Sequence, residues 1–509
     1  MGVQLRFGAA IFAAALFGAG ASPVAAQKSA DTLRITMRDA LPNIDPYYNN
    51  LRTGVVMSHQ GWDGLVYRNP DSFKIEPLLA TEWKLPDTTT IEFTLRPGVK
   101  FHDGSPFTAD DVVYTLNLVS DPMSKVSTPA NYNWIEKAEK TGDMSVRVKL
   151  KRPTPAALEY FALVLPIYPK TYREKVGPEG YAKAPVGTGP YKMTRVEPGV
   201  SIDFERFEDY WAGSPKGKPA IKNLSVRFVP DATTEMTELL AGRADWIWNL
   251  NPDQFDSVNK LPHIQAVRKE SMRVGYLLLD ASGRTGADNP ITKLKVRQAI
   301  SHAIDRQAIA DKLVTGGSRV PGAPCFPTQF GCNGEVAVLY DYNPAKAKAL
   351  LAEAGYPDGF EVELASYVLP QWGAAVQNYL MAVGIRAKLN QLQVAALIQR
   401  AKAGELRAYL GSWGSFSIND VSAFMPNFFD GGADDYARDP DVQEWLIEGG
   451  SSNDPEARNK AYSSAIKRIT DQAYIVPLHT YVTTYGYSKQ LDFTPYSDEL
   501  PRFYLAKWK

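Results

Sequence analysis

The stretch that follows residue 343 alternates between the periodicities of helices and strands, and this alternation restricts the possible folds more than any other feature. Asn343-Pro344 is a typical helix entrance, and apolar residues then recur on one helix face until Gly355. Residues 360–364 alternate between apolar and acidic side chains, as in a half-buried strand. A helix predicted over 371–383 leads to a second alternating strand over 385–389. Strand, helix and strand in this order form a βαβ unit, so the sequence predicts an α/β fold with a parallel sheet.

The first half of the chain shows the same mixture of elements. Residues 90–96 alternate as a strand does, Pro97-Gly98 turns the chain, and Thr108 stands before an acidic first helical turn. No internal repeat, low-complexity tract or flexible linker interrupts the sequence. We therefore expect lobes that are connected by strands crossing between them more than once.

Residues 1–26 have the order of a secretory signal peptide. Arg6 supplies a positive charge, an apolar run extends from Phe7 to Gly20, and the small residues Val24-Ala25-Ala26 mark a cleavage site. The run is too short to cross a bilayer as a helix, which takes about 20 apolar residues. No cysteine stands at the cleavage site to carry a lipid. We expect an exported periplasmic protein that begins at Gln27 and is not inserted in a membrane.

Size and charge limit the remaining possibilities. Without residues 1–26 the chain is still longer than a single hydrophobic core normally organises, so at least two lobes are expected. The whole sequence has 56 basic and 56 acidic residues, a formal net charge of +0. This balance gives no electrostatic footprint for nucleic acid or for an anionic membrane.

The only two cysteines stand close together in a loop. Cys325 and Cys332 are separated by Pro327 and Gly331, among other residues, and in an oxidising compartment such a pair forms a disulfide. A redox or metal-binding role is the alternative. Neither a CxxC spacing nor a neighbouring histidine supports that alternative.

No catalytic or metal-binding motif is present in the sequence. HExxH, GxSxG and phosphate-loop patterns are missing. His102 and Asp103 are adjacent, but neighbours on an extended chain point in different directions and make a poor catalytic pair. We expect no catalytic residues, no metal site and no cofactor. The histidines are scattered through the chain: His59, His102, His263, His302 and His479.

A series of motifs along the chain resembles a known family. Leu79 to Trp83 (LATEW) is followed by Phe93 to Gly104 (FTLRPGVKFHDG) and Thr108 to Val112 (TADDV). These motifs resemble the signature of family 5 extracellular solute-binding proteins, the peptide-, nickel- and glutathione-binding proteins that serve ABC importers. The resemblance covers essentially the whole mature chain. Further matches are Gly187 to Tyr191, Tyr210-Trp211, Val296 to Ile300, Ala303 to Arg306, Tyr342 to Pro344, Ala354 to Tyr356, and Ile475 to His479.

The resemblance implies an α/β fold of two lobes that close on a ligand. Lobe I is expected to be discontinuous, with residues 27–277 and 475–509 and an extra subdomain at about 65–185. Lobe II is expected over 278–474. Two crossing segments, near 276–281 and 474–479, are expected to form the hinge.

The resemblance also implies a function and partners. We expect a monomeric substrate-binding component that captures a small organic solute, peptide-like or other, and delivers it to the membrane subunits of an ABC importer. Binding of a metal chelate, as in nickel-binding relatives, is an alternative, because a chelate brings its own ligands. A periplasmic hydrolase is a less favoured alternative. A role in presenting the ligand to a chemoreceptor is not separable from uptake at this stage.

Trp413 is the leading candidate for a ligand contact, because relatives have a tryptophan and a ligand-facing loop at this place. Ser415 and Asp420 lie in the same loop and are able to hydrogen bond. Dipeptide-binding relatives have a Trp-x-Gly-Asp pattern in which the aspartate pairs with the α-amine of the peptide. Here Phe416 stands in its place. Since an unpaired buried ammonium costs several kcal/mol, dipeptide binding requires a substitute such as Asp420.

Other candidates are aromatic and polar residues from segments expected at the cleft. A binding site of this type needs aromatic walls and a few fixed polar groups. An arginine there suits a carboxylate or phosphate. These candidates are Tyr47, Tyr132, Trp134, Trp248, Asn249, Arg273 and Tyr367.

Overall fold

The computed structural model describes residue 2 and residues 31–49 and 51–509. The predicted signal peptide, apart from residue 2, lies outside this part of the chain. Within the described part, no helix has both the length and the apolar character needed to cross a bilayer.

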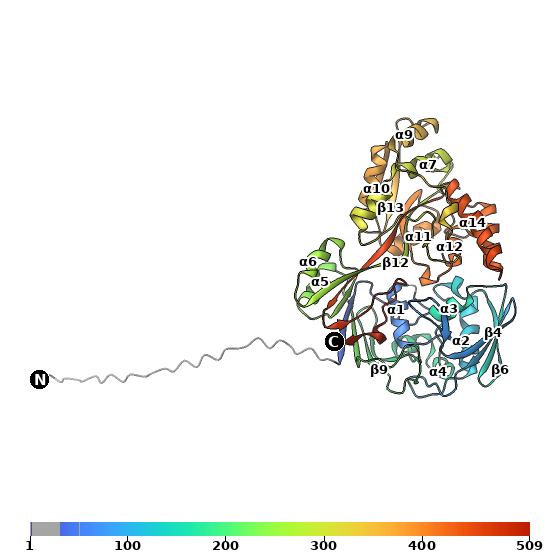
Figure 1. Cartoon of the computed structure of the whole chain (residues 1–509), viewed down its shortest axis with the longest axis vertical. Helices are drawn as coiled ribbons and strands as arrows, with labels where there is room; N and C mark the ends of the chain where they lie inside the picture. Colours follow the sequence, from blue (N-terminus) through green and yellow to red (C-terminus); the bar gives the residue numbers. More distant parts are fainter. Residues whose placement is uncertain (1, 3–30, 50) are drawn as a thin grey trace.

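A ten-stranded sheet runs through the whole molecule, with two long antiparallel strands, β12 (Ile264–Leu279) and β16 (Ile475–Ser488), in its centre. These two strands pass from one body of the molecule to the other, and we call the two bodies lobe I and lobe II (Figure 1). The lobe I side of the sheet contains β11 (Trp246–Trp248), β1 (Thr32–Met37), β10 (Asn223–Phe228), β9 (Ser201–Arg206) and β8 (Tyr191–Glu197). The lobe II side contains β15 (Ala408–Trp413), β13 (Phe360–Ser366) and β14 (Ile385–Gln391).

Lobe II contains the predicted βαβ unit. Strands β13 and β14 pair in parallel, and α10 (Pro370–Ala382) connects them. The helix predicted at Asn343-Pro344 is α9 (Pro344–Glu353), where the Asn343 side chain accepts a hydrogen bond from the backbone N–H of Lys346. The local prediction for this region is confirmed. The other α-helices of lobe II are α7 (Leu294–Ala303), α8 (Arg306–Ala308), α11 (Val394–Ala403), α12 (Met425–Phe429), α13 (Pro440–Ser451) and α14 (Pro455–Asp471).

Lobe I has a second, four-stranded sheet in the order β4-β5-β7-β6. The predicted strand at 90–96 is β5 (Thr90–Leu95), and the predicted helix start at Thr108 opens α2 (Ala109–Ser120) with a capping box between Thr108 and Asp111. The sheet's other strands are β4 (Ala80–Asp87), β6 (Ile135–Gly142) and β7 (Ser145–Leu150). Helices α1 (Arg52–Gly61), α3 (Ala157–Leu163) and α4 (Lys170–Lys183) complete this part of the lobe.

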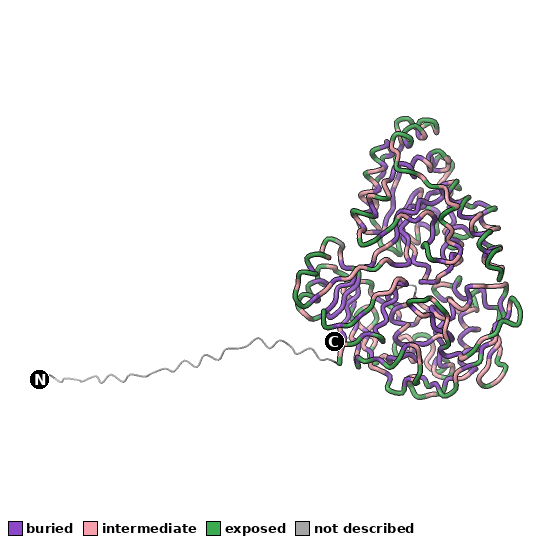
Figure 2. The backbone as a smooth tube through the Cα atoms, viewed as in Figure 1, coloured by how far each residue is buried: buried purple, intermediate pink, exposed green. Residues whose placement is uncertain are grey.

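Buried residues fill the interior of both lobes (Figure 2). One buried residue belongs to the other lobe's core. Ile418 follows β15 of lobe II, yet it is 0% exposed and packs in the hydrophobic cluster of lobe I. The predicted disulfide between Cys325 and Cys332 is present in lobe II.

Candidate binding site between the lobes

The pairing of β12 with β16 is irregular at the place where both strands pass between the lobes. The register shifts between Ser271 and Val274 and again between Gly275 and Tyr276. Such irregularities bend a strand and re-aim its side chains. Arg273 lies within the first register shift, so its side chain does not have to follow the alternating directions that a regular strand imposes on successive side chains.

Arg273 contacts both lobes. Its Nη2 lies 3.0 Å from Oε2 of Glu499, in the C-terminal segment of lobe I, and its Nη1 donates to Oγ of Ser412, on β15 of lobe II, at 3.2 Å. The Arg273 side chain keeps 20% of its surface exposed. Solvent therefore reaches part of this side chain.

Arg52, the first residue of α1, approaches the same carboxylate. Its Nη2 lies 3.4 Å from Oε2 of Glu499, and its Nη1 donates to Oγ of Ser417 at 2.7 Å. A Cβ atom added to Gly414 would lie 2.6 Å from Nη2 of Arg52 and 3.1 Å from Nη2 of Arg273. The two guanidinium groups thus meet beside Gly414 with Glu499 between them.

Charges are unequal in the cluster of Arg52, Arg273 and Glu499, because two guanidinium cations share one carboxylate. Burial lowers the pKa of Arg52 to about 10, although Glu499 opposes this change. Burial alone would raise the pKa of Glu499, but Arg273 and Arg52 together hold it below its ordinary value. Glu499 by itself balances only one of the two guanidinium charges.

Asp39 is a further carboxylate close to this site, just beyond the end of β1. Burial among surrounding groups raises its pKa, while Arg273 and Arg38 act in the opposite direction. Asp39 is exposed, and the neighbouring Arg38 pairs with Glu235 instead. Asp39 is therefore available to a cationic group of a ligand.

Aromatic side chains lie beside Arg273, which is 5.8 Å from the ring centroid of Tyr481 and shares Ser412 with Tyr367. Trp413, Tyr367 and Tyr481 are all half-buried. The Tyr367 hydroxyl donates to the backbone oxygen of Ser412 at 2.6 Å, and the indole Nε1 of Trp413 donates to the backbone oxygen of Ala423 at 2.8 Å. Their polar atoms are fixed by the backbone, so their ring faces are held in place. The structure thus brings together three predicted residues, Trp413, Tyr367 and Arg273.

The loop after Trp413 has an unusual backbone. Ser415, Phe416 and Ser417 have φ values of 50°, 49° and 67°, a left-handed conformation that non-glycine residues adopt at a cost. Ser415, predicted to face the ligand, is buried. The Phe416 ring lies edge-on to Trp413, with ring centroids 5.4 Å apart, and packs against the cluster of lobe I. Phe416 therefore occupies interlobe space with an apolar ring.

Asp420 already has a partner. Its carboxylate accepts hydrogen bonds from Nη2 of Arg458, on α14, at 2.7 and 3.0 Å, and both side chains are buried. Separating this pair for a ligand amine would leave Arg458 uncompensated. We therefore do not carry Asp420 forward as the substitute for the missing aspartate.

Tyr47, Tyr132 and Trp134 lie in the interior of lobe I. The rings of Tyr47 and Tyr132 are 5.2 Å apart edge-to-face, and all three residues are buried. The Tyr47 hydroxyl donates to the backbone oxygen of Pro166, and the Trp134 indole donates to that of Asn131. Their hydrogen-bonding groups are used internally, so these residues pack the core and we do not propose them as ligand contacts.

Trp248 and Asn249 are separate from that cluster. Trp248 is buried in β11 and packs against Trp246, with ring centroids 6.2 Å apart. Asn249 is exposed and has a φ of 58°, which asparagine tolerates better than most residues. Among the residues that the structure describes, no hydrogen bond or ion pair joins Trp248 or Asn249 to Arg52 or Arg273.

Sequence reasoning missed four residues of the site: Arg52, Ser412, Glu499 and Tyr481. Arg52 and Glu499 are charged residues in segments without a motif, and they meet across almost the whole length of the chain. A local pattern carries no signal for such a contact. Tyr481 could have been predicted from the sequence, because it follows the matched segment 475–479 on the same strand.

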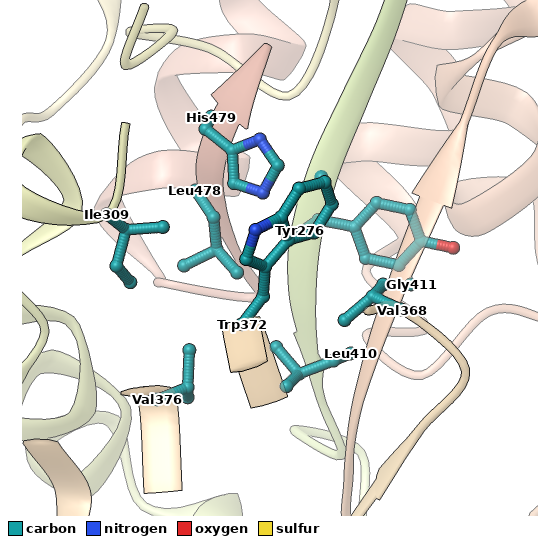
Figure 3. Close-up of a pocket in the computed structure, with 10 residues that line it drawn as sticks. Tyr276, Ile309, Val368, Trp372, Val376, Leu410, Gly411, Leu478 and His479 are labelled. Carbon is teal, nitrogen blue, oxygen red and sulfur yellow. The ribbon is translucent and has the colours of Figure 1, made fainter. Parts of the chain in front are cut away.

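A small cavity lies behind the second register shift. It has a volume of about 10 Å³, room for about one water molecule. Trp372 and His479 lie side by side at this cavity, with the Tyr276 hydroxyl turned away from them (Figure 3). Their ring centroids are 4.7 Å apart, and burial lowers the pKa of His479 to about 4. The cavity is too small for an organic solute. The charged and aromatic residues around Arg273 form the better candidate site, because they join groups from both lobes.

Comparisons with known proteins agree with this two-lobed arrangement. The family described as bacterial extracellular solute-binding proteins, family 5 Middle, matches residues 74–436. Heme-binding protein A of Haemophilus influenzae is 30% identical over 459 residues, which cover 83% of this chain and 82% of that protein. Glutathione-binding protein GsiB of Salmonella typhi is 27% identical and covers 88% of each chain. The structure of the PBP AgaA in complex with agropinic acid, from A.tumefacien R10, has a TM-score of 0.80 at 27% identity, and the match covers 94% of this chain and 99% of that one.

Proposed function

This chain belongs to family 5 of the bacterial extracellular solute-binding proteins, and from that premise we propose that it captures a small organic solute carrying at least one carboxylate. As a family member it is the substrate-binding component of an ABC importer. The proposal concerns the chemistry of its cargo and the place where the cargo is held.

The observation that carries the proposal is the shared carboxylate of Glu499. Arg273 and Arg52 approach it at 3.0 and 3.4 Å, so two cations face one anion where the lobes meet. A guanidinium binds a carboxylate with two parallel hydrogen bonds, which gives both strength and orientation. A ligand carboxylate would accept hydrogen bonds from the guanidinium N–H groups that Glu499 does not occupy. It would also balance the second positive charge of the arginine pair.

The relatives' ligands support this chemistry. Heme, glutathione and agropinic acid differ in size and shape, but each is an organic molecule with carboxylate groups. The half-buried aromatic rings of Trp413, Tyr367 and Tyr481 suit the remaining, less polar part of such a solute. Asp39 offers a position for a ligand ammonium, in place of the aspartate that Phe416 replaces.

Metal chelates remain a second candidate. A chelate formed by an organic acid also presents carboxylates, so the same arginine pair would orient it. The proposal treats the protein as a binder rather than a hydrolase, because the named relatives are binding proteins.

Hinge closure accounts for capture. A solute held by lobe II that also contacts Arg52 and Arg273 favours the closed form by its differential affinity. Moving a population from mostly open to mostly closed takes about 5.5 kcal/mol. Micromolar binding supplies about 8 kcal/mol in total, so the closure is within reach.

The location of the protein, its monomeric state and its lobe boundaries are proposed as the sequence predicts them. Residues 1–26 act as a signal peptide, and the mature monomer works in the periplasm, where membrane subunits of the importer receive the closed form. The lobe boundaries are residues 27–277 with 475–509 and residues 278–474, with the hinge at the crossing strands.

Mass spectrometry of small molecules released from the purified, denatured protein tests the proposal directly. We expect a carboxylate-bearing solute. Refolded protein should then bind that solute in calorimetry. A derivative of the solute whose carboxylate is converted to an amide or a methyl ester should bind much more weakly. Equal affinity for the acid and its uncharged derivative would contradict the proposal.

A further inference from the structure

The lobe II segment 414–419, which we call the latch, docks on lobe I. Ile418 is fully buried in the lobe I cluster. The backbone N–H of Asn419 donates to Oε2 of Glu159, on α3, at 3.2 Å. The latch therefore has both an apolar anchor and a backbone hydrogen bond on the opposite lobe.

Ser417 contributes the polar part of this docking. Its Oγ accepts from Nη1 of Arg52 at 2.7 Å and donates to the backbone oxygen of Asp498. Its carbonyl accepts from Nη1 of Arg68, a fully buried side chain. Arg68 also bonds Oε2 of Glu159 at 2.7 Å, so the groups that receive the latch are themselves held in position.

The other face of the latch rests on the disulfide-bonded loop 325–332, which we call the brace. Gln329 is 3% exposed, and its Nε2 donates to the carbonyl of Ile418 at 2.8 Å. Its Oε1 accepts from the backbone N–H of Phe326 at 3.0 Å. One side chain thus links the interior of the brace to the residue that enters lobe I.

Backbone hydrogen bonds add a second link. The N–H of Phe330 donates to the carbonyl of Asn419, and the N–H of Val421 donates to the carbonyl of Phe330, both at 3.1 Å. Cys325 and Cys332 close the brace on either side of these residues. The contacts of the latch with lobe II therefore come largely from an eight-residue ring with little conformational freedom.

We propose that the brace is a positioning element for closure: it holds the latch, in its left-handed conformation, in the form that lobe I receives. The proposal rests on the closure proposed above. A disulfide reduces the freedom of the loop it closes, and ordering a segment beforehand lowers the entropy lost when it docks. Without the brace, the strained turn at 415–417 would relax between closures, and each closure would have to order it again.

The experiment uses the full mature chain as purified, with its bound solute retained, because closure depends on that solute. Three variants are compared with the wild type: Cys325→Ser with Cys332→Ser, Gln329→Leu, and the matched control Gln377→Leu. Gln377 is a half-buried lobe II glutamine that, like Gln329, donates to a backbone carbonyl, here that of Ala387 at 2.9 Å, away from the latch. Gln329→Leu keeps the disulfide, so it reports on the brace even where the double serine variant folds poorly.

Small-angle scattering and hydrogen exchange provide the two readouts. We expect a larger radius of gyration in both brace variants and exchange of the amides of 414–421 that is roughly tenfold faster, with the control like the wild type. An unchanged radius in the brace variants would overturn the proposal, even with faster exchange, because the brace would then act within lobe II alone. An equal effect of Gln377→Leu would overturn it as well.

The two proposals fail in different ways. If the brace variants open the molecule but no carboxylate-bearing solute binds, the proposed role of the brace is supported and the proposed cargo is wrong. If the solute binds as proposed and the brace variants stay as compact as the wild type, the proposed cargo is supported and the proposed role of the brace is wrong.

Discussion

Arg273 and Glu499 pair between a central strand and the C-terminal segment, with Arg273 Nη2 and Glu499 Oε2 3.0 Å apart. The same guanidinium reaches Ser412 on β15, which belongs to the other lobe. One side chain thus contacts residues of both lobes and stays partly exposed to solvent. This position makes Arg273 the first residue to test.

Replacing Arg273 by methionine should weaken binding of the carboxylate-bearing solute by on the order of 30-fold or more, because truncating one partner of a buried charge pair costs about 2–5 kcal/mol. Calorimetry on the refolded protein measures the change. Arg195→Met is the control, since Arg195 pairs with Glu197 on an exposed surface. Wild-type affinity in Arg273→Met would place the ligand elsewhere.

Ser415→Gly should stabilise the protein, by about 1 kcal/mol, because glycine adopts a φ of 50° without the cost that serine bears. Urea unfolding measures the free energy. Ser415→Ala is the matched comparison, since alanine keeps the strain and loses only the hydroxyl. The strain argument is wrong if glycine proves no more stable than alanine.

Tyr47→Phe should lower the free energy of unfolding by about 1–3 kcal/mol, because it leaves the buried carbonyl of Pro166 without its donor. Its affinity for the solute should stay at the wild-type value, since Tyr47 lies within the lobe I core. A selective loss of affinity with unchanged stability would return Tyr47 to the binding site.

His479 should make the protein less stable in acid. Burial lowers its pKa to about 4, below the ordinary value of about 6.5. The unfolded state therefore binds more protons between these two values, and stability contributed above pH 6.5 is lost as pH falls toward 4. The full loss amounts to about 3 kcal/mol.

Unfolding curves across this pH range test the assignment. His479→Gln should lose stability less steeply than the wild type as pH falls, whereas the exposed control His263→Gln should follow the wild type. Identical pH slopes for His479→Gln and the wild type would contradict it.

The sequence predicted those features that depend on nearby residues. The βαβ unit follows from periodicity over a few turns, and the helix start at Thr108 follows from the acidic residues just after it. The disulfide was predictable because its cysteines are only seven residues apart, in a sequence with no other cysteine. Each of these signals lies within one short stretch.

The site depends on contacts that no short stretch contains. Trp413 was identified through the resemblance, but Arg52 and Glu499 meet only because the chain returns to lobe I at its end. Tyr47, Tyr132 and Trp134 were chosen as aromatic residues near an expected cleft, and aromatic residues fill cores as readily as they line pockets. Asp420 looked available in sequence, whereas Arg458, on a distant helix, occupies it.

The central strand β16 has a consequence for how the protein matures. It pairs with β11 of lobe I and with β12 along nearly its whole length, and it begins only at Ile475. During synthesis and export, lobe I thus lacks a middle strand of its sheet until almost the entire polypeptide has emerged. A chain cut short before this point would leave both bodies of the molecule with an open sheet edge, a surface that invites aggregation rather than partial activity.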